Sequence, residues 1–160
     1  MRPLKTQFRR GSEKGSIAVE TALCLPILIV FLVVPLFLAR AFWYYGVAEK
    51  AAHDGARFLS NARQWEIVAT PGSGGQDLPI AQLAEAIAHA ELDEIKPALE
   101  WFSITALCDL DECGFAVPQT VRLSVRLRMR DEIFGPFTSE FFGDEPLLLE
   151  ARVTMRYVGN

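Results

Sequence analysis

Residues 14–39 read KGSIAVETALCLPILIVFLVVPLFLA, and this stretch decides what kind of protein the chain is. From Ala22 to Ala39 it holds 18 consecutive residues without a charge. Counted from Ile17 the apolar stretch is 23 residues long, and Glu20 is its interruption. A bilayer core of about 30 Å needs about 20 helical residues. The stretch therefore predicts a helix that spans a membrane at about residues 17–40.

The residues on either side of this stretch predict its orientation. Residues 1–15 carry five basic side chains and one acidic one, a net charge of +4, and the aromatic residues 42–45 follow the stretch. Basic residues stay on the cytoplasmic side, and aromatic residues gather at membrane interfaces. We therefore expect a cytoplasmic N-terminus and an external body. The whole chain has a net charge of −4, so the residues after the first 15 carry a net charge of −8. This acidic charge argues against nucleic-acid binding, because a nucleic-acid-binding domain needs a basic folded surface.

Two other interpretations of the apolar stretch remain open. A buried core helix is one, although 18 apolar residues exceed the usual core segment. A secretory signal peptide is the other, because Ala39-Arg40-Ala41 fits a small-x-small cleavage pattern. Against a signal peptide, its apolar region usually has about 7–15 residues, and the helical pattern here continues past Ala41. Pro26 and Pro35 permit a kink in the helix.

Glu20 needs an explanation, because a carboxylate in an apolar helix costs on the order of 2.5 kcal/mol at the bilayer centre and less near an interface. One interpretation is a helix-start residue at headgroup depth, where its charge complements the helix dipole. The other is functional. Glu20 lies five residues after Gly15, behind a basic leader. A cut after Gly15 would create an amine on Ser16, and four residues rise about 6 Å along a helix. Pairing with this amine, within a chain or between subunits, would set an axial register.

The string Lys14-Gly15-Ser16-Ile17-Ala18-Val19-Glu20 resembles the processing site of type IV prepilins and pseudopilins. The following Val19-Glu20-Thr21-Ala22-Leu23-Cys24-Leu25-Pro26 resembles the opening of TadE-like proteins, the minor pseudopilins of tight-adherence (Tad, Flp-type) pilus systems. The Ala-rich stretch that ends in Gly55-Ala56-Arg57 and the terminus 151–157 are also similar to that family. The region most similar to the family is about residues 14–57.

The resemblance implies a role and a set of partners. It implies that a prepilin peptidase cuts between Gly15 and Ser16 and that Glu20 becomes the fifth mature residue. The implied partners are the bacterial inner membrane, this peptidase, other Tad pilins and pseudopilins, and the pilus assembly platform. The implied role is support of pilus biogenesis, adhesion and biofilm formation. Many type IV pilins begin with an aromatic residue that is often N-methylated, and Ser16 departs from that pattern.

The body is expected to form a small α+β head of the type IV pilin kind. The sequence predicts a leader at 1–15, a long helix at 16–62, a linker at 63–76 and a periplasmic head at 77–160. Within the head, apolar spacing predicts an amphipathic helix from about Asp77 to Ile95. Three strand candidates follow, at about 99–107, 120–130 and 147–157. Alternation of apolar and polar residues in the last two fits an antiparallel sheet of about three strands with one wet face.

Two features of the head are candidate sites. Cys108 and Cys113 are expected to form a disulfide if the head lies in the oxidising periplasm, and Cys24 would remain unpaired. The wet sheet face is either solvated or a docking surface for another pseudopilin or an acidic partner, because arginine binds carboxylates bidentately. Its arginines are Arg122, Arg126, Arg128, Arg130, Arg152 and Arg156. The Phe-rich segment 133–143 either folds onto the core or contacts a partner.

No catalytic or cofactor motif emerges from the rest of the chain. Pro71–Gly75 lacks the Lys-Ser/Thr of a phosphate loop. His89 and Glu91 lack ligand spacing, and the acidic residues at 109–112 lack the EF-hand pattern for calcium. We therefore expect a protein that is not an enzyme and needs no cofactor or metal. The alternative is an uncleaved single-pass anchor with a periplasmic scaffolding or binding head. An exported hydrolase that uses Asp111 or Glu112 would be a third class.

Overall fold

A computed structural model describes residues 14–68, 80–129, 135 and 147–159. Its contacts divide the chain into two compact units, Met1–Leu38 and Ala39–Asn160. The described elements are helices α1 (Lys14–Ser60), α2 (Gln64–Ile67) and α3 (Ile80–Leu92), a 3-10 turn (Lys96–Ala98), and strands β1 (Leu99–Cys108), β2 (Thr120–Met129) and β3 (Leu148–Arg156). The expected α+β class, with a long apolar N-terminal helix, a further helix and a three-stranded antiparallel sheet, is confirmed.

Helix α1 is continuous through both prolines of the apolar stretch, Pro26 and Pro35. It begins at Lys14 and ends at Ser60, close to the predicted bounds of 16 and 62. Its later part, from Ala39, belongs to the second unit and turns small side chains inward. Ala48, Ala51, Ala52 and Ala56 have no exposed surface. A helix surface without bulky side chains allows close approach of other elements, so this part of α1 forms one wall of the core.

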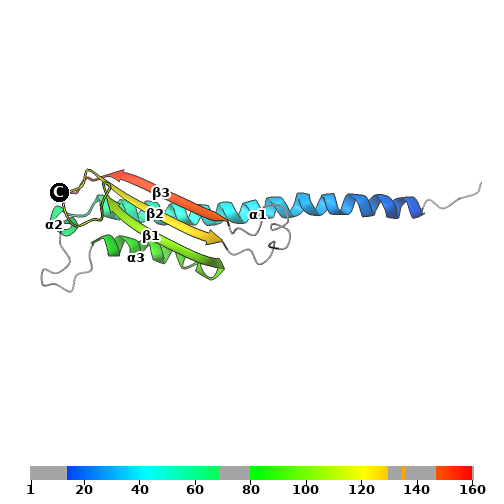
Figure 1. The fold of residues 1–160 in the computed structure, drawn as a ribbon, viewed down its shortest axis with the longest axis horizontal. Coiled ribbons are helices and arrows are strands. Elements are labelled where there is room, and N and C mark those ends of the chain that lie inside the picture. The colour runs from blue at the N-terminus through cyan, green and yellow to red at the C-terminus, as the bar shows by residue number, and fades with distance from the viewer. Residues whose placement is uncertain (1–13, 69–79, 130–134, 136–146, 160) are drawn as a thin grey trace, which may run out of the picture. The chain divides into compact units, whose positions relative to one another are not determined.

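The sheet has the order β1-β2-β3, and both neighbouring pairs are antiparallel (Figure 1). Leu107 lies opposite Arg122, and Val125 lies opposite Ala151. The central strand β2 alternates as the sequence predicts. Its inward side chains are at most 1% exposed, namely Val121, Leu123, Val125, Leu127 and Met129. Full burial of such a side chain contributes about 1.5–3 kcal/mol relative to exposure, so β2 supplies the main apolar layer of the core.

Helix α3 packs on the side of the sheet to which the inward side chains of β2 point, and its Ala84, Ala88 and Leu92 are buried. The described helix is shorter than the predicted span of about 77–95: residues 77–79 lie outside the described part, and the helix ends at Leu92. Lys50 of α1 forms an ion pair with Glu91 of α3, which ties the two helices together. His89 stacks edge-on against Phe102, with the ring centres 5.2 Å apart. His89 is exposed, so this ring contact lies at the surface.

The C-terminal residues cover the end of α1. The backbone N–H of Val158 donates to the carbonyl oxygen of Ser60 at 2.9 Å. The Tyr157 hydroxyl donates to the carbonyl oxygen of Ala62 at 2.7 Å. The last carbonyls of a helix have no partner within the helix, so these bonds satisfy groups that would otherwise need water. The contact is tight, because a β-carbon on Gly159 would lie 1.8 Å from the Ala62 oxygen.

Several expected features fall in or near parts of the chain that are not described. The glycine-rich stretch at 71–75, Arg130 and, apart from Gly135, the Phe-rich segment 133–143 lie outside the described residues. Within the segment expected as a linker at 63–76, the structure contains the short helix α2. The Glu66 side chain accepts a hydrogen bond from the Arg63 backbone N–H at 2.8 Å, which holds its first turn. This bond from the third helical residue back to the N-cap is one half of a capping box, and it stabilises a helix start without any apolar periodicity.

Candidate functional site

The apolar part of α1 has the surface of a lipid-facing helix. Its most apolar 18-residue window has a mean hydropathy of 2.9, and none of that window is buried. Leu23 is 68% exposed and Phe31 is 76% exposed. A core helix would bury these side chains against other elements, so the interpretation as a buried core helix is wrong. One helix in the described part of the chain is long and apolar enough to cross a membrane, and this suggests that it anchors the chain there.

Glu20 lies on this apolar surface. It lines an open groove of about 380 Å³ together with Ile17, Thr21, Cys24, Leu25 and Leu28. The Thr21 hydroxyl donates to the Ile17 carbonyl oxygen at 2.8 Å, so Thr21 needs no outside partner. The described residues give Glu20 no such hydrogen bond and no ion pair. An isolated carboxylate in apolar surroundings is costly unless a cation or donors reach it. Glu20 is the one acidic residue of the apolar stretch, and a cation or hydrogen-bond donor from another molecule would lower the cost of its charge.

The predicted cleavage site lies at the beginning of the same helix. Lys14 is the first described residue of α1, so the Gly15–Ser16 peptide bond lies in the part of the helix that precedes the apolar stretch. Four residues separate Ser16 from Glu20, which is one helical turn.

The glycine of the Ala-rich stretch is a packing position. A β-carbon on Gly55 would lie 2.9 Å from Leu123 Cδ1 and 3.1 Å from the carbonyl oxygen of Ala84. Helix α1 thus meets both the central strand and α3 at Gly55. Its neighbour Ala56 is fully buried, whereas Arg57 is exposed. Gly55 and Ala56 therefore have a packing role in the core. Arg57 is the residue of this motif whose side chain is accessible to other molecules.

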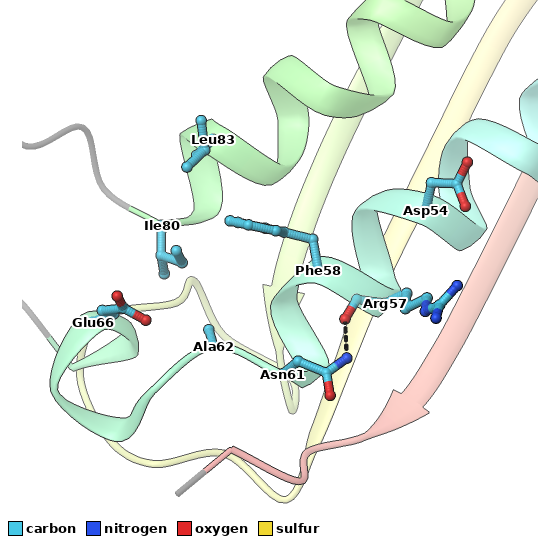
Figure 2. A pocket seen from close by; sticks show the side chains of 8 residues that line it. All are labelled: Asp54, Arg57, Phe58, Asn61, Ala62, Glu66, Ile80 and Leu83. Atoms are coloured by element: carbon cyan, nitrogen blue, oxygen red, sulfur yellow. Dashed lines mark hydrogen bonds between the residues drawn. The ribbon is translucent and has the colours of Figure 1, made fainter.

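Arg57 borders a pocket that the sequence did not single out (Figure 2). The pocket has a volume of about 480 Å³ and opens between the end of α1, α2 and the start of α3. Its lining is Asp54, Arg57, Phe58, Asn61, Ala62, Glu66, Ile80 and Leu83. The Asn61 side chain is held by its bond to the Arg57 carbonyl oxygen at 2.8 Å. The charged groups among these eight residues are the carboxylates of Asp54 and Glu66 and the guanidinium group of Arg57.

The arginines of the sheet share its outer face, opposite the buried side chains of β2. Arg126, Arg128, Arg152 and Arg156 are exposed and Arg122 is half-buried. Glu150 is the acid among them: its carboxylate lies 2.5 Å from Arg152 and 3.4 Å from Arg126. The hydrogen bond from Arg152 and the charge of Arg126 lower the pKa of Glu150, so it stays ionised. Five arginines against one glutamate leave this face at +4, and we call it the arginine face.

The predicted disulfide joins Cys108 and Cys113, with α-carbons 4.8 Å apart, and Cys24 is a free cysteine. Asp109, within the closed loop, has a φ of 59°. Its carboxylate accepts hydrogen bonds from the backbone N–H of Gln119 at 3.1 Å and of Thr120 at 2.8 Å. These bonds lower the pKa of Asp109. The Asp109 carboxylate therefore has a structural role, because it fixes the disulfide loop to the start of β2. In the described residues no group of three or more His, Cys, Asp and Glu could hold a metal ion.

Comparison with known proteins finds a match for the apolar part of α1 and for the helical residues that follow it. Residues 15–57 match the sequence model of the TadE-like protein family. The match begins at the glycine of the predicted cleavage site, includes Glu20, and ends at the arginine beside Gly55. No curated protein and no solved structure matches the chain. Over residues 15–57 the chain is thus similar to the TadE-like protein family, and this similarity suggests an association with the Tad pilus system.

Proposed function

We propose that this protein is a minor pseudopilin of a tight-adherence (Tad, Flp-type) pilus system. A prepilin peptidase would cut it after Gly15, and the mature chain would support pilus biogenesis, adhesion and biofilm formation. The observation that carries the proposal is the family match over residues 15–57, because it includes Gly15, Glu20 and the apolar part of α1 in one segment. The protein would act by binding other subunits and would not be an enzyme.

The chemistry of the membrane segment supports this role. The cut would leave a cationic amine on Ser16, one turn from Glu20 on α1. An amine of the same or a neighbouring subunit would remove the cost of the unpaired carboxylate in apolar surroundings. This relief depends on distance, so it would be largest at one axial position of neighbouring helices. Glu20 would thereby select the register in which subunits assemble.

The charge and the cysteines support an orientation with the head in the periplasm. The leader, residues 1–15, carries a net +4, and positively charged flanks stay in the cytoplasm. The Cys108–Cys113 disulfide is typical of an oxidising compartment. The partners in this account are the inner membrane, the prepilin peptidase, other Tad pilins and pseudopilins, and the assembly platform.

Pilus assembly in a host strain that lacks the gene tests the proposal. Wild-type protein should restore surface pili, and Gly15→Leu should fail because the bulky side chain blocks the cut. Glu20→Gln should be cut normally and still restore few or no pili, because the amide carries no charge to pair with the amine. Thr21→Val, next to Glu20, is the matched control and should restore pili. Full piliation by both Gly15→Leu and Glu20→Gln would reject the proposal and favour an uncleaved anchor with a scaffolding head.

A further inference from the structure

The outer edge of β3 presents backbone groups that have no bonding partner among the described residues. The Tyr157 N–H donates to the Gln119 oxygen, and the Leu147 oxygen accepts from the Met129 N–H, so odd-numbered residues of this strand bond toward β2. Alternate residues of an antiparallel strand direct their N–H and C=O groups to opposite sides. The even-numbered residues therefore face away from β2, and no described residue bonds to their backbone groups. They are Leu148, Glu150, Arg152, Thr154 and Arg156.

The outer edge of β1 is protected, in contrast. The backbone N–H of Ala106 donates to the Glu85 carboxylate of α3 at 3.1 Å. Cys108 exchanges two backbone hydrogen bonds with Asp111 within the disulfide loop, at 2.8 and 3.2 Å. The register of β1 also shifts between Leu99 and Trp101. Covered donors and irregularities are the devices by which proteins prevent strand addition. β3 pairs with β2 without a register shift and contains no proline.

The side chains beside the open edge are charged in a pattern that favours an acidic neighbour. The even-numbered residues of β3, whose backbone groups face away from β2, have their side chains on the arginine face. Glu150 already holds Arg126 and Arg152, whereas Arg128 and Arg156 have no ion pair with any described residue. An incoming strand with a carboxylate at every second position would place these groups beside Arg152 and Arg156 of β3, with Arg128 one strand further away on β2. Pairing with the backbone groups of β3 needs N–H donors, which a phosphate backbone lacks, so an acidic peptide fits this edge better than a nucleic acid.

We propose that β3 is the acceptor for an extended acidic segment of a partner protein, which adds to the sheet as a fourth strand. Backbone hydrogen bonds to the even-numbered residues of β3 would give affinity, and alternate carboxylates on the arginine face would give specificity. The strand has nine residues, which corresponds to about 30 Å of extended chain. The inference does not rest on the proposed pilus role, because it follows from the head alone.

A synthetic nine-residue peptide of alternating valine and glutamate, labelled with a fluorophore, is the probe. The protein is the full chain in lipid nanodiscs, and fluorescence anisotropy measures binding. In antiparallel addition, residues directly opposite each other exchange hydrogen bonds, so glutamates on the arginine face direct their own N–H groups at β3. N-methylation of the glutamate amides should therefore weaken binding at least tenfold at unchanged charge. N-methylation of the valine amides is the matched control and should change it less than threefold. A valine–lysine peptide should not bind.

Variants of the protein test the charge pattern. Arg152→Glu with Arg156→Glu should weaken binding of the valine–glutamate peptide at least tenfold. Arg63→Glu with Lys96→Glu alters two exposed cations away from the arginine face and should leave binding unchanged. Circular dichroism and thermal unfolding of each variant verify the fold. Equal affinity for the two N-methylated peptides would overturn strand addition. Absence of saturable binding would overturn the proposal as a whole.

A cysteine at the edge distinguishes a second copy of the chain as the occupant. The variant Thr154→Cys, prepared with Cys24→Ser, places one free thiol beside the outward backbone groups. Under mild oxidation in the membrane it should remain monomeric in our account. A disulfide-linked homodimer, lost when the valine–glutamate peptide is added, would assign the edge to a second copy and overturn the proposal of an acidic partner.

Discussion

Gly55 and Leu123 approach so closely that a β-carbon at Gly55 would lie 2.9 Å from Leu123 Cδ1. The carbonyl oxygen of Ala84 lies on the other side, 3.1 Å from the same position. The backbone of α3 cannot move without disturbing its own helix, and Leu123 is completely buried in the core. The absence of a side chain at Gly55 is therefore what allows α1 to contact β2 and α3 together.

This geometry predicts opposite effects of one substitution at two glycines of α1. Gly55→Ala should destabilise the head by about 1–3 kcal/mol, because overpacking a filled core has that cost. Gly46→Ala meets no atom within 4 Å and should be neutral or stabilise by up to about 1 kcal/mol through helix propensity. Thermal unfolding of the full chain in detergent measures both. A Gly55→Ala protein as stable as Gly46→Ala would show that α1 is not packed as described.

The Asp109 carboxylate predicts a dependence of stability on pH. Its hydrogen bonds from Thr120 and Gln119 hold its pKa below the ordinary value near 3.8. A lowered folded-state pKa gives stability that is present above the unfolded pKa and is lost as the pH falls through the folded pKa. Wild-type protein should therefore melt at a higher temperature than Asp109→Asn at pH 7, and the gap should close below about pH 4. Asparagine also tolerates a positive φ, so the backbone is preserved. A gap that is constant from pH 7 to pH 3 would contradict this role.

The bond between Tyr157 and Ala62 predicts a loss of stability on removal of one hydroxyl. Tyr157→Phe should cost about 1 kcal/mol, because it leaves the Ala62 oxygen without this donor at the end of α1. Tyr45→Phe is the control, since Tyr45 is 40% exposed and makes no hydrogen bond with the described residues. Burial, and then the charge of Glu66, raises the pKa of Tyr157 above 10. The Tyr157 contribution should therefore be complete below pH 10 and disappear as the pH rises through the folded-state pKa. Equal melting of the two variants would exclude the bond.

The elements with strong periodicity were predictable from the sequence. The 18-residue uncharged run gave the membrane part of α1, and alternation of apolar residues with arginines gave β2 and the arginine face. These patterns are local, so no knowledge of neighbours is needed to interpret them. Helix α2 was missed because a four-residue helix has no period to detect. The available signal was Glu66, whose side chain accepts the hydrogen bond of the Arg63 backbone N–H three residues before it.

The features that depend on which elements meet were not predictable. The sequence marks Gly55 as part of a motif, but its reason is the contact with Leu123 and Ala84 across distant parts of the chain. The sequence shows Asp109 only as one of several acidic residues without a calcium-binding pattern, whereas its φ of 59° and its bonds to residues 119 and 120 place it in a structural role. The open edge of β3 follows from the strand order, which the pattern of a single strand does not encode.

Glu20 predicts a separation of processing from assembly at the level of the isolated protein. Glu20→Gln should leave the melting temperature of the head unchanged, because the residue lies in the other compact unit. In a membrane it should weaken association between processed chains by at least tenfold, since the charge pair with the new amine is lost. Resonance energy transfer between two labelled copies in liposomes measures the association, and Thr21→Val is the control. Unchanged association of Glu20→Gln would remove Glu20 from the assembly account.

The N-terminal residue and intact mass of the protein, purified from native membranes that contain an active prepilin peptidase, test the central claim most directly. The account predicts a chain that begins at Ser16, and a Gly15→Leu variant that begins at Met1. A wild-type chain that begins at Met1 would contradict processing and favour the uncleaved anchor. A chain that begins at Phe42 would show that the apolar segment is a signal peptide, and it would contradict the membrane-anchored account as well.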